Sequence, residues 1–197
     1  MRNAEVTRNS IITESANLFN TKGYKSTSIS DITRATGLTK GAIYRHFENK
    51  QDLEQHALRS LSKKMFDKIG ASIREENTCK DKFEVIFNFF EAYLNTPLYE
   101  GGCPLMNAAI EADDANPVLR QQAFTILAQL KASVVKILEN GIANNQIKKE
   151  IDTTHYSTIV IACLEGGIMM SKLERNKNAI SATTKHLRSL IDSISVA

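Results

Sequence analysis

Residues 23–53 of this chain read GYKSTSISDITRATGLTKGAIYRHFENKQDL. Within this stretch, Ser28 and Asp31 stand at the spacing of a capping box, in which a hydroxyl and an acidic side chain satisfy each other's backbone amides. This spacing predicts that a short helix begins at Ser28 or at Thr27. The stretch therefore carries a strong local signal for where one helix starts.

A second short helix is predicted directly after the first. Gly37 suits the left-handed residue that ends a helix, and Thr39 can cap a new helix over residues 40–47. Ile43 and Phe47 lie four residues apart and so share one face, which we expect to be buried. Because the connection is of turn length, the stretch predicts a helix-turn-helix, a motif whose second helix enters the major groove of DNA.

The second helix and its neighbours supply side chains for two kinds of DNA contact. Lys40 and Arg45 are candidates for base edges, since either can donate to guanine O6 and N7, and Thr39 or Ala42 can touch a thymine methyl group. Phosphate contacts are predicted for residues that offer a hydroxyl, an imidazole, an ammonium group or a helix N-terminus: Tyr44, His46, Lys50, Thr27 and Ser28.

The second helix also contains a glycine and two residues with an alternative role. Gly41 is expected to leave room where the backbone must approach DNA. Tyr44 and His46 have an alternative role, which is packing inside the small domain rather than contact with phosphate.

The residues of this stretch resemble the DNA-binding pattern of the TetR-like bacterial transcriptional repressors. The matching positions run in order without a gap: Gly23, Tyr24, Thr27, Ser28, Ile32, Gly37, Gly41, Tyr44, His46, Phe47, Lys50 and Leu53. Thr33 and Thr36 depart from the alanine that the family prefers, and Leu38 and Thr39 replace valine and serine. The specific resemblance covers residues 8–54. It implies an all-α fold, with an N-terminal three-helix helix-turn-helix domain followed by a helical ligand-binding and dimerisation domain.

Composition agrees with a folded regulator. The chain has 197 residues with 42% apolar content, which suffices for a proper core. It has no run of eighteen apolar residues, and its N-terminus lacks the apolar segment of a signal peptide, so we expect a cytoplasmic protein without a membrane span. The three cysteines, Cys79, Cys103 and Cys163, contain no Cys-x-x-Cys pair. Neither a disulfide framework nor a metal site nor a cofactor is predicted.

Positive charge is concentrated at the N-terminal end. Residues 1–50 hold eight Lys and Arg against four Asp and Glu, a net charge of +4, and residues 51–197 hold seventeen against eighteen, a net charge of −1. Alone, this excess is typical of an ordinary solvated surface. Together with the helix-turn-helix it favours a DNA-binding end.

Helical periodicity extends over the rest of the chain, and no strand pattern competes with it. We expect a DNA-binding domain over residues 1–48 and a second domain over 49–197. The first helix should end near Lys22, and Asn49 can cap a long helix that leaves the DNA-binding motif. The remaining helices and one loop are predicted over residues 83–94, 105–112, 113–117 (the loop), 118–144, 154–173 and 179–195.

The predicted recognition helix is too short to read more than a few base pairs. Discrimination then requires two copies on half-sites about 34–36 Å apart, so we expect a dimer on a near-palindromic DNA operator. The resemblance implies that the last two helices pair with their copies in a four-helix interface, where Gly166 and Gly167 would allow close approach. Local helix irregularity is the alternative role of these glycines.

The second domain is predicted to bind a small-molecule effector, with an apolar or cationic-aromatic compound as the best fit. Its proposed lining consists of Phe87, Phe90, Tyr93, Met106 and Met169, with Asn107 and Glu111 as polar groups one helical turn apart. The alternative is that the aromatic residues belong to an ordinary core. We expect the ligand to favour a conformer in which the linking helix swings and separates the two recognition helices.

The sequence gives less support to other functions. A repressor that senses oxidants or electrophiles through Cys103 is an alternative, and burial of that thiol as a small apolar group opposes it. The sequence has no Ser-His-Asp order with local support, no phosphate-binding glycine loop and no His-Glu-x-x-His, so catalysis is not predicted. A nonspecific architectural DNA-binding protein would need more positive charge.

Overall fold

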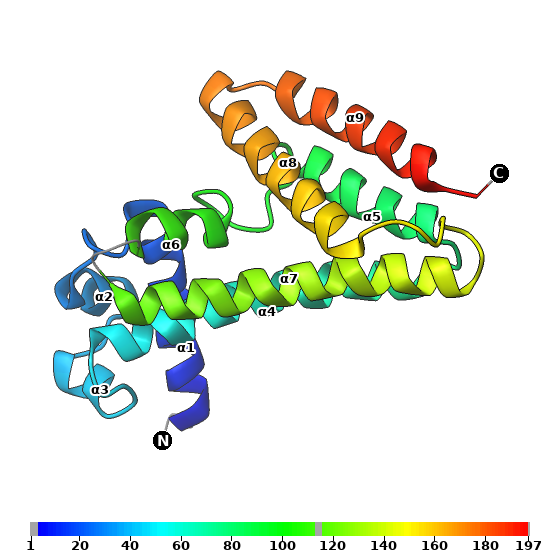
Figure 1. The fold of residues 1–197 in the computed structure, drawn as a ribbon. Coiled ribbons are helices and arrows are strands. Elements are labelled where there is room, and N and C mark those ends of the chain that lie inside the picture. Colours follow the sequence, from blue (N-terminus) through cyan, green and yellow to red (C-terminus); the bar gives the residue numbers. More distant parts are fainter. Residues whose placement is uncertain (1–3, 113–115, 197) are drawn as a thin grey trace. The chain divides into compact units, whose positions relative to one another are not determined.

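The structure is a computed structural model that describes residues 4–112 and 116–196. These residues form nine α-helices, and the only pairing of strand type among them is an isolated antiparallel bridge between Ile147 and Ser195. The helices, in chain order, are α1 Ala4–Lys22, α2 Ile29–Thr36, α3 Lys40–Tyr44, α4 Lys50–Glu75, α5 Cys79–Ala92, α6 Pro104–Ala112, α7 Pro117–Ala143, α8 Thr153–Glu174 and α9 Asn178–Ile194 (Figure 1). The predicted all-α fold is confirmed.

The chain divides into two compact units that each combine separate stretches of sequence. The first unit contains residues 1–65 and 99–126, and the second contains residues 66–98 and 127–197. The borders of the units fall inside α4 and α7. The predicted border after residue 48 differs from this division, because α6 and the start of α7 pack with the N-terminal helices rather than with the C-terminal ones.

The caps of the helix-turn-helix form as the sequence predicts. The hydroxyl of Ser28 accepts a hydrogen bond from the Asp31 amide at 3.2 Å, and the Asp31 carboxylate accepts one from the Ser28 amide at 2.8 Å. Gly37 ends α2 with a φ of 67°, in the left-handed region. Thr39 caps α3, its hydroxyl accepting from the Ala42 amide at 3.2 Å. Each of these contacts spans three residues or fewer, so the local sequence alone can specify them.

Two predicted helix boundaries differ from the structure by three residues or more. The second helix of the motif was predicted to reach Phe47, but α3 ends at Tyr44, after which the amides of His46 and Phe47 both bond to the Ile43 carbonyl. The predicted helix over 83–94 begins earlier, at Cys79, because Thr78 accepts a hydrogen bond from the Asp81 amide and acts as an N-cap.

The start of α7 is also set by a cap. The side-chain oxygen of Asn116 accepts from the Leu119 amide at 3.1 Å, at the first turn of this helix. Asp113, Asp114 and Ala115, the first three residues of the loop predicted over 113–117, lie outside the described residues.

The core of the first unit lies where α1, α2, α3 and the start of α4 meet. Phe19 and Tyr24 stack with ring centroids 5.1 Å apart and ring planes 5° from parallel. The apolar side chains that fill this core are almost fully buried, and they are Ile11, Phe19, Tyr24, Ile32, Ile43, Phe47, Leu53 and Ala57. Burial of Ile43 and Phe47 confirms the predicted inner face of the second helix of the motif.

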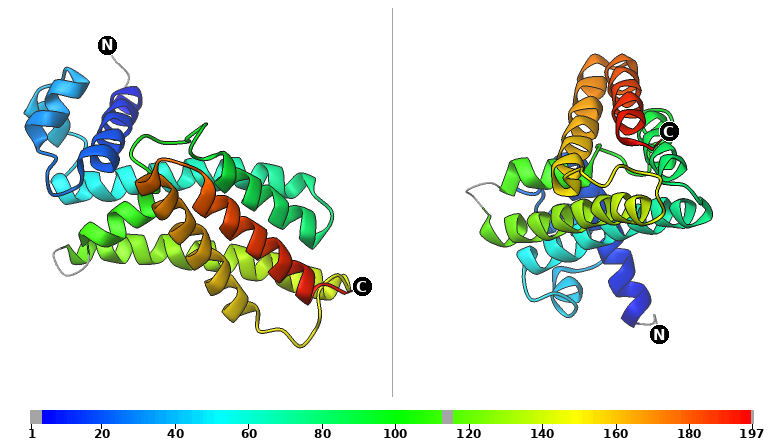
Figure 2. Two further views of the ribbon diagram at one scale, coloured as in Figure 1. Left: turned by 90° about the horizontal axis from the view of Figure 1, so that it is seen from above. Right: turned by 45° about the vertical axis from the view of Figure 1, so that its right-hand side comes forward.

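In the second unit, α8 and α9 run side by side and α5 lies against α9 (Figure 1, Figure 2). A Cβ added to Gly167 would lie 2.9 Å from Thr183 Oγ1 and 3.0 Å from Ile180 Cδ1, so this glycine allows α8 to approach α9 of the same chain. Around Gly166, by contrast, the described residues leave open space. The two neighbouring glycines therefore face different surroundings.

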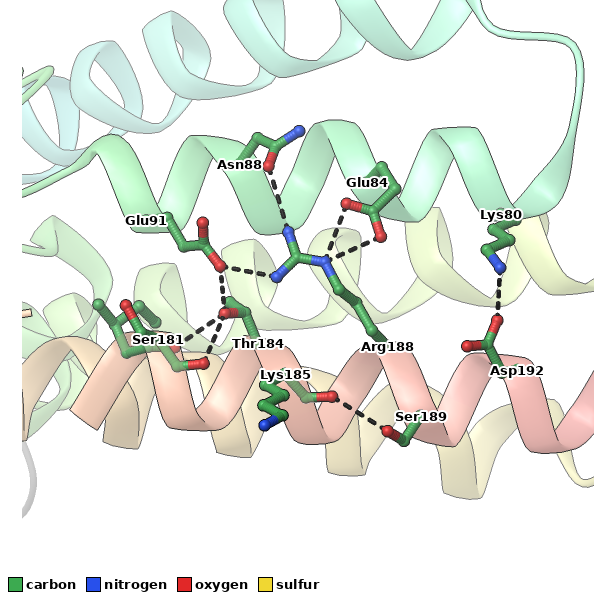
Figure 3. A network of polar contacts seen from close by, with 11 residues as sticks. Lys80, Glu84, Asn88, Glu91, Ser181, Thr184, Lys185, Arg188, Ser189 and Asp192 are labelled. Carbon is green, nitrogen blue, oxygen red and sulfur yellow. Dashed lines mark hydrogen bonds and ion pairs between the residues drawn. The ribbon is translucent and has the colours of Figure 1, made fainter. Parts of the chain in front are cut away.

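A polar network joins α5 to α9 (Figure 3). The Arg188 guanidinium donates to both carboxylate oxygens of Glu84, at 2.9 and 3.0 Å, and to Glu91 at 2.7 Å. The Thr184 hydroxyl also donates to Glu91. Burial opposes ionisation of Glu91, but the hydrogen bonds from Thr184 and Arg188 outweigh it and lower the pKa of this carboxyl. The network fixes α9 on α5 through side chains about a hundred positions apart.

One helix is long and apolar enough to meet the length and composition criteria for crossing a membrane. This helix is α8, and only a third of its most apolar window is buried in the chain. Such a test is also passed by helices of soluble proteins.

Candidate DNA-binding surface

The short helix α3 presents most of the predicted DNA contacts to solvent. Thr39, Lys40, Tyr44 and Arg45 are all exposed, and 40% of the Tyr44 surface is accessible. The Lys40 ammonium lies 5.8 Å from the centroid of the Tyr44 ring, so the two side chains share one side of the helix. The alternative role for Tyr44, packing inside the domain, does not fit this exposure.

Gly41 has no packing partner that would require a glycine. Within the described residues, and apart from its own helix backbone, no atom lies within 4 Å of the position that a Cβ would take. Ala42 is half-buried beside it. Because residue 41 has no side chain, a partner can approach the backbone of α3 closely at this position.

The basic residues of the N-terminal end are not equally available. Among the described residues, Lys22 pairs with Asp31 at 2.7 Å, whereas Lys40 and Arg45 form no ion pair. Hydrogen bonds from Lys22 and Ser28 hold the pKa of Asp31 well below its ordinary value. Lys40, in α3, and Arg45, directly after it, therefore keep their positive charge open to a partner.

Two predicted phosphate contacts need correction. Thr27 is 1% exposed, and its hydroxyl donates to the Gly23 carbonyl at 2.7 Å, so its side chain stabilises the entry to α2 and does not face solvent. The Lys50 ammonium turns inward, where it donates to the Tyr24 carbonyl and pairs with Glu54 at 3.1 Å. Both residues match the sequence pattern because they hold the motif together.

His46 and Ser28 remain at the surface. Ser28 is exposed at the N-terminus of α2, and His46 is half-buried, with its ring 6.4 Å from that of Phe47. His46 thus has one side against the domain and one side toward solvent. Packing and phosphate contact are both open to it.

The sequence did not predict a cluster of Arg8, Phe47 and His56, which packs next to α3 on the side of the domain core. Arg8 of α1 lies 5.1 Å from the centroid of the Phe47 ring and donates to the ring of His56, with Nη2 at 2.9 Å from Nε2. His56 Nε2 is also 3.4 Å from Asp52. Burial and the charge of Arg8 lower the pKa of His56, although Asp52 opposes this. Residues 48 positions apart meet here, and no short-range pattern predicts such a contact.

The predicted ligand-binding residues divide between the two units. Phe87, Phe90, Tyr93 and Met169 belong to the second unit, and Met106, Asn107 and Glu111 belong to the first. Phe87 is 1% exposed and lies against Phe83 and under the Arg188 guanidinium, as a core residue does.

The other predicted lining residues also have definite positions. Phe90 is half-buried, Tyr93 is buried and Met169 is 43% exposed, while Met106 is half-buried.

Asn107 and Glu111 have a role that differs from the predicted one. The Asn107 side chain donates to the backbone and side-chain oxygens of Asn20, and the Glu111 carboxylate accepts from the Lys25 amide. These polar groups are therefore engaged with the end of α1 and the segment that follows it. A role as ligand-fixing groups does not fit those bonds.

The cysteines and acidic residues show no metal centre. Within residues 4–112 and 116–196, no three His, Cys, Asp or Glu side chains gather closely enough to hold an ion. Burial raises the pKa of the Cys79 thiol to about 11, which disfavours the reactive thiolate. Cys103 is half-buried just before α6, and its carbonyl accepts from the Asn107 amide at 3.1 Å.

Comparisons with known proteins assign both parts of the chain. A family model described as "Bacterial regulatory proteins, tetR family" matches residues 11–57, and one described as "Tetracyclin repressor-like, C-terminal domain" matches residues 79–187. The second model alone spans more than half of the chain.

Solved structures and a curated relative agree with these models. A TetR transcriptional regulator from Chloroflexus aurantiacus is 32% identical over 100% of both chains, with a TM-score of 0.94. A TetR-family regulator from Cytophaga hutchinsonii is 31% identical over 100% of this chain and 98% of its own, with a TM-score of 0.91. The HTH-type transcriptional repressor DhaR of Mycobacterium sp. (strain GP1) is 24% identical over 88% of this chain and 86% of its own.

These relatives are DNA-binding transcriptional regulators rather than enzymes, and the comparisons give no support to the alternative of a thiol sensor. The family models, the full-length structural matches and the exposed helix-turn-helix all indicate a DNA-binding transcriptional regulator. This chain belongs to the TetR family of bacterial transcriptional regulators.

Proposed function

We propose that this protein is a cytoplasmic repressor that binds a near-palindromic operator as a homodimer and leaves it when a small-molecule inducer binds. The observation that carries the proposal is the exposed face of α3, where Lys40, Tyr44 and Arg45 surround the open position of Gly41. Lys40 and Arg45 read base edges, Tyr44 and Ser28 contact phosphates, and Thr39 and Ala42 touch thymine methyl groups.

The proposed dimer forms through α8 and α9, each helix pairing with its copy. Support comes from apolar side chains that α8 leaves accessible, Met169, Met170 and Leu173, of which Leu173 is 78% exposed. Gly166 faces open space on the same helix, so a second backbone can approach there. Burying such side chains gives about 1.5–3 kcal/mol for each one fully covered, a large driving force for association.

The proposed inducer acts through the helical domain rather than at α3. Phe90 and Tyr93 on α5 are the aromatic residues of the predicted lining that remain candidates for contact with an apolar or cationic-aromatic compound. Ligand favours a conformer in which α4 swings and the two recognition helices separate, so that binding of inducer and of operator oppose each other.

The first test is binding-site selection from random DNA at fixed salt. The native protein is compared with the double variant Lys40→Ala, Tyr44→Ala, and with Lys149→Ala as a control that removes a charge from an exposed position in the loop between α7 and α8. We expect the native protein and the control to enrich the same near-palindrome. The double variant should bind that site at least about 30-fold more weakly, since one bidentate base contact alone is worth about 1–3 kcal/mol.

Failure of this test has a clear meaning. No enrichment by the native protein, or equal enrichment by the double variant, would show that α3 is not the reading surface. The selected site also supplies the probe for screening compounds that release DNA.

The dimer is tested separately by sedimentation at equilibrium. Met170→Glu with Leu173→Glu places two charges on the proposed interface and should give a monomer, whereas Phe124→Glu, which changes an equally accessible apolar residue of α7, should remain a dimer. A dimer that survives the first pair of changes would contradict the proposed interface.

A further inference from the structure

Residues 20–25, which comprise the end of α1 and the start of the segment that leads to α2, make a sharp turn that we call the corner. The corner connects α1 to the helix-turn-helix, and in the first unit it is held by hydrogen bonds from α6 and from the loop before α6. These bonds join residues more than eighty positions apart.

Asn20 is the centre of the first group of bonds. It is 4% exposed, its side-chain amide donates to the carbonyls of Glu100 and Gly102, and its own oxygens accept from the Asn107 amide at 3.0 and 3.2 Å. The bond to Gly102 is buried and the other three are partly buried, so a partner lost while the site stays closed leaves a poorly hydrated polar group. The bonds from Asn107 require α6 in its present position, and those to Glu100 and Gly102 require the loop before it.

Gly101 shows how closely the loop approaches the corner. Its φ is +87°, and a Cβ at this position would lie 2.1 Å from the Asn20 carbonyl oxygen. No side chain fits there. The loop and the end of α1 thus touch backbone to backbone.

Glu111 makes the second group of bonds. Its carboxylate accepts from the Lys25 amide at 3.1 Å, and a Cβ on Gly23 would lie 2.8 Å from Glu111 Oε1. Asn107 and Glu111 lie one turn apart on α6, so one helix holds both ends of the corner.

A third connection reaches the corner from α7. Asn116, which caps α7, donates to the buried Glu54 carboxylate at 3.0 Å, and Glu54 pairs with Lys50. The Lys50 ammonium donates to the Tyr24 carbonyl. A continuous chain of polar contacts therefore runs from the N-terminus of α7 to the corner.

We propose that Asn107 and Glu111 are positioning residues which set operator affinity by holding the corner. The proposal deepens the proposed function and rests on it. When the corner is held, the orientation of α2 and α3 is restricted to one that fits a half-site. When the corner is released, only a fraction of molecules has that orientation, and the apparent affinity falls by the same fraction.

The test uses the full-length protein without inducer. Asn107→Ala and Glu111→Leu remove the bonds, Glu111→Gln keeps an acceptor for the Lys25 amide, and Ile110→Ala changes a 70% exposed residue of the same helix as a control. Gly101→Ala is a second way to break the corner, because its methyl group clashes with the Asn20 carbonyl.

Two measurements are made on each variant. Hydrogen exchange of residues 20–36, compared with α8 and α9, reports the corner without DNA. Binding to the operator selected by the native protein, at several salt concentrations, reports affinity and the number of phosphate contacts.

We expect Asn107→Ala, Glu111→Leu and Gly101→Ala to speed exchange in residues 20–36 only, and to weaken operator binding about 5-fold or more. The salt dependence should stay unchanged, because neither residue contacts phosphate, whereas loss of one phosphate contact lowers the slope by about 0.9. Glu111→Gln and Ile110→Ala should behave as the native protein does.

The outcomes separate this proposal from the proposed function. Unchanged exchange in residues 20–36, or unchanged or tighter operator binding with faster exchange, overturns the role of the corner. Faster exchange in α8 and α9 as well would show general destabilisation and also overturn it. Absence of any selected operator for the native protein would instead refute the proposed function, while the exchange data would still decide whether α6 holds the corner.

Discussion

The helix-turn-helix and the bundle of α5, α8 and α9 are stabilised by contacts of different range. In the helix-turn-helix, Ser28 and Asp31 cap α2 and Thr39 caps α3 through bonds that span three residues. In the bundle, Arg188 joins Glu84 and Glu91 across about a hundred positions. The difference teaches that the helix-turn-helix is specified by local sequence, whereas the bundle depends on contacts between helices that are distant in sequence.

In the bundle, an arginine over an aromatic ring also forms ion pairs, whereas Arg8 over the Phe47 ring in the first unit bonds to His56. Arg188 lies over the Phe87 ring. It also donates to two carboxylates (Figure 3), and these hydrogen bonds raise its own pKa. A network of this kind sets which faces of α5 and α9 meet, because other registers would leave half-buried charges without partners.

The largest expected loss of stability comes from replacing a buried phenylalanine by alanine in one of the two regions. Phe47→Ala removes a 2% exposed ring and should destabilise the helix-turn-helix by about 3–5 kcal/mol, since the cavity adds to the lost burial. Hydrogen exchange should increase over residues 28–47, and operator binding should be lost.

Phe83→Ala is the matched change in the bundle, where the ring is 1% exposed. It should speed exchange in α5 and α9 and leave residues 28–47 protected. If either variant loosened both regions equally, the two would not be separate in stability, and the contrast between them would fail.

A smaller effect is expected from the network of the bundle. Arg188→Met should lower the free energy of unfolding by about 1–2 kcal/mol, since the partners are about a third exposed and solvent screens part of the interaction. Lys80→Met breaks the exposed pair with Asp192 and should leave the free energy of unfolding nearly unchanged. Urea unfolding followed by circular dichroism measures both, and equal losses would show that Arg188 is no more than a surface residue.

Removal of helix caps should cost about the same in both regions. Ser28→Ala in the helix-turn-helix and Thr78→Ala before α5 each remove a side-chain acceptor at an N-terminus, worth about 1 kcal/mol. Exchange of the first-turn amides gives the local free energy of opening. A loss of several kcal/mol at one site would mean that the cap also acts through tertiary contacts, which would sharpen the distinction between the regions.

The smallest effect is a dependence on pH near the helix-turn-helix. The pKa of His56 is lowered in the folded state by burial and by Arg8 and Arg59, against the opposing charge of Asp52. The folded state therefore binds fewer protons than the unfolded state, so this contribution is present above about pH 6.5 and is lost as the pH falls through the lowered folded pKa.

His56→Gln is the variant that isolates this contribution. As the pH falls from about 7 to about 5, the unfolding free energy of the native protein should fall relative to that of the variant. A difference that stays constant over that range would show that His56 keeps its ordinary pKa in the fold.

The sequence by itself determined the helix-turn-helix in detail. The caps at Ser28 and Thr39, the left-handed Gly37 and the buried pair of Ile43 and Phe47 all follow from spacing, because helix starts, helix ends and helix faces depend on neighbours within four residues. The same stretch of residues carried the family resemblance. Most helix positions in the rest of the chain also followed from apolar periodicity.

Sequence reasoning was less successful where one residue type has two roles. Thr27 and Lys50 match the DNA-binding pattern but hold the motif together, since a hydroxyl or an ammonium group serves a backbone carbonyl as well as a phosphate. Asn107 and Glu111 were assigned to a ligand, and only the fold shows that the end of α1 and the start of the corner lie within reach of α6.

Only the tertiary structure decided which distant residues share a compact unit. α6 and the start of α7 join the N-terminal helices, Gly101 touches Asn20, and Arg188 selects the face that α9 presents to α5. Periodicity states which face of a helix is apolar but not which helix covers it. The partner is chosen by packing and by the requirement that buried polar groups find hydrogen bonds, and both depend on the whole chain at once.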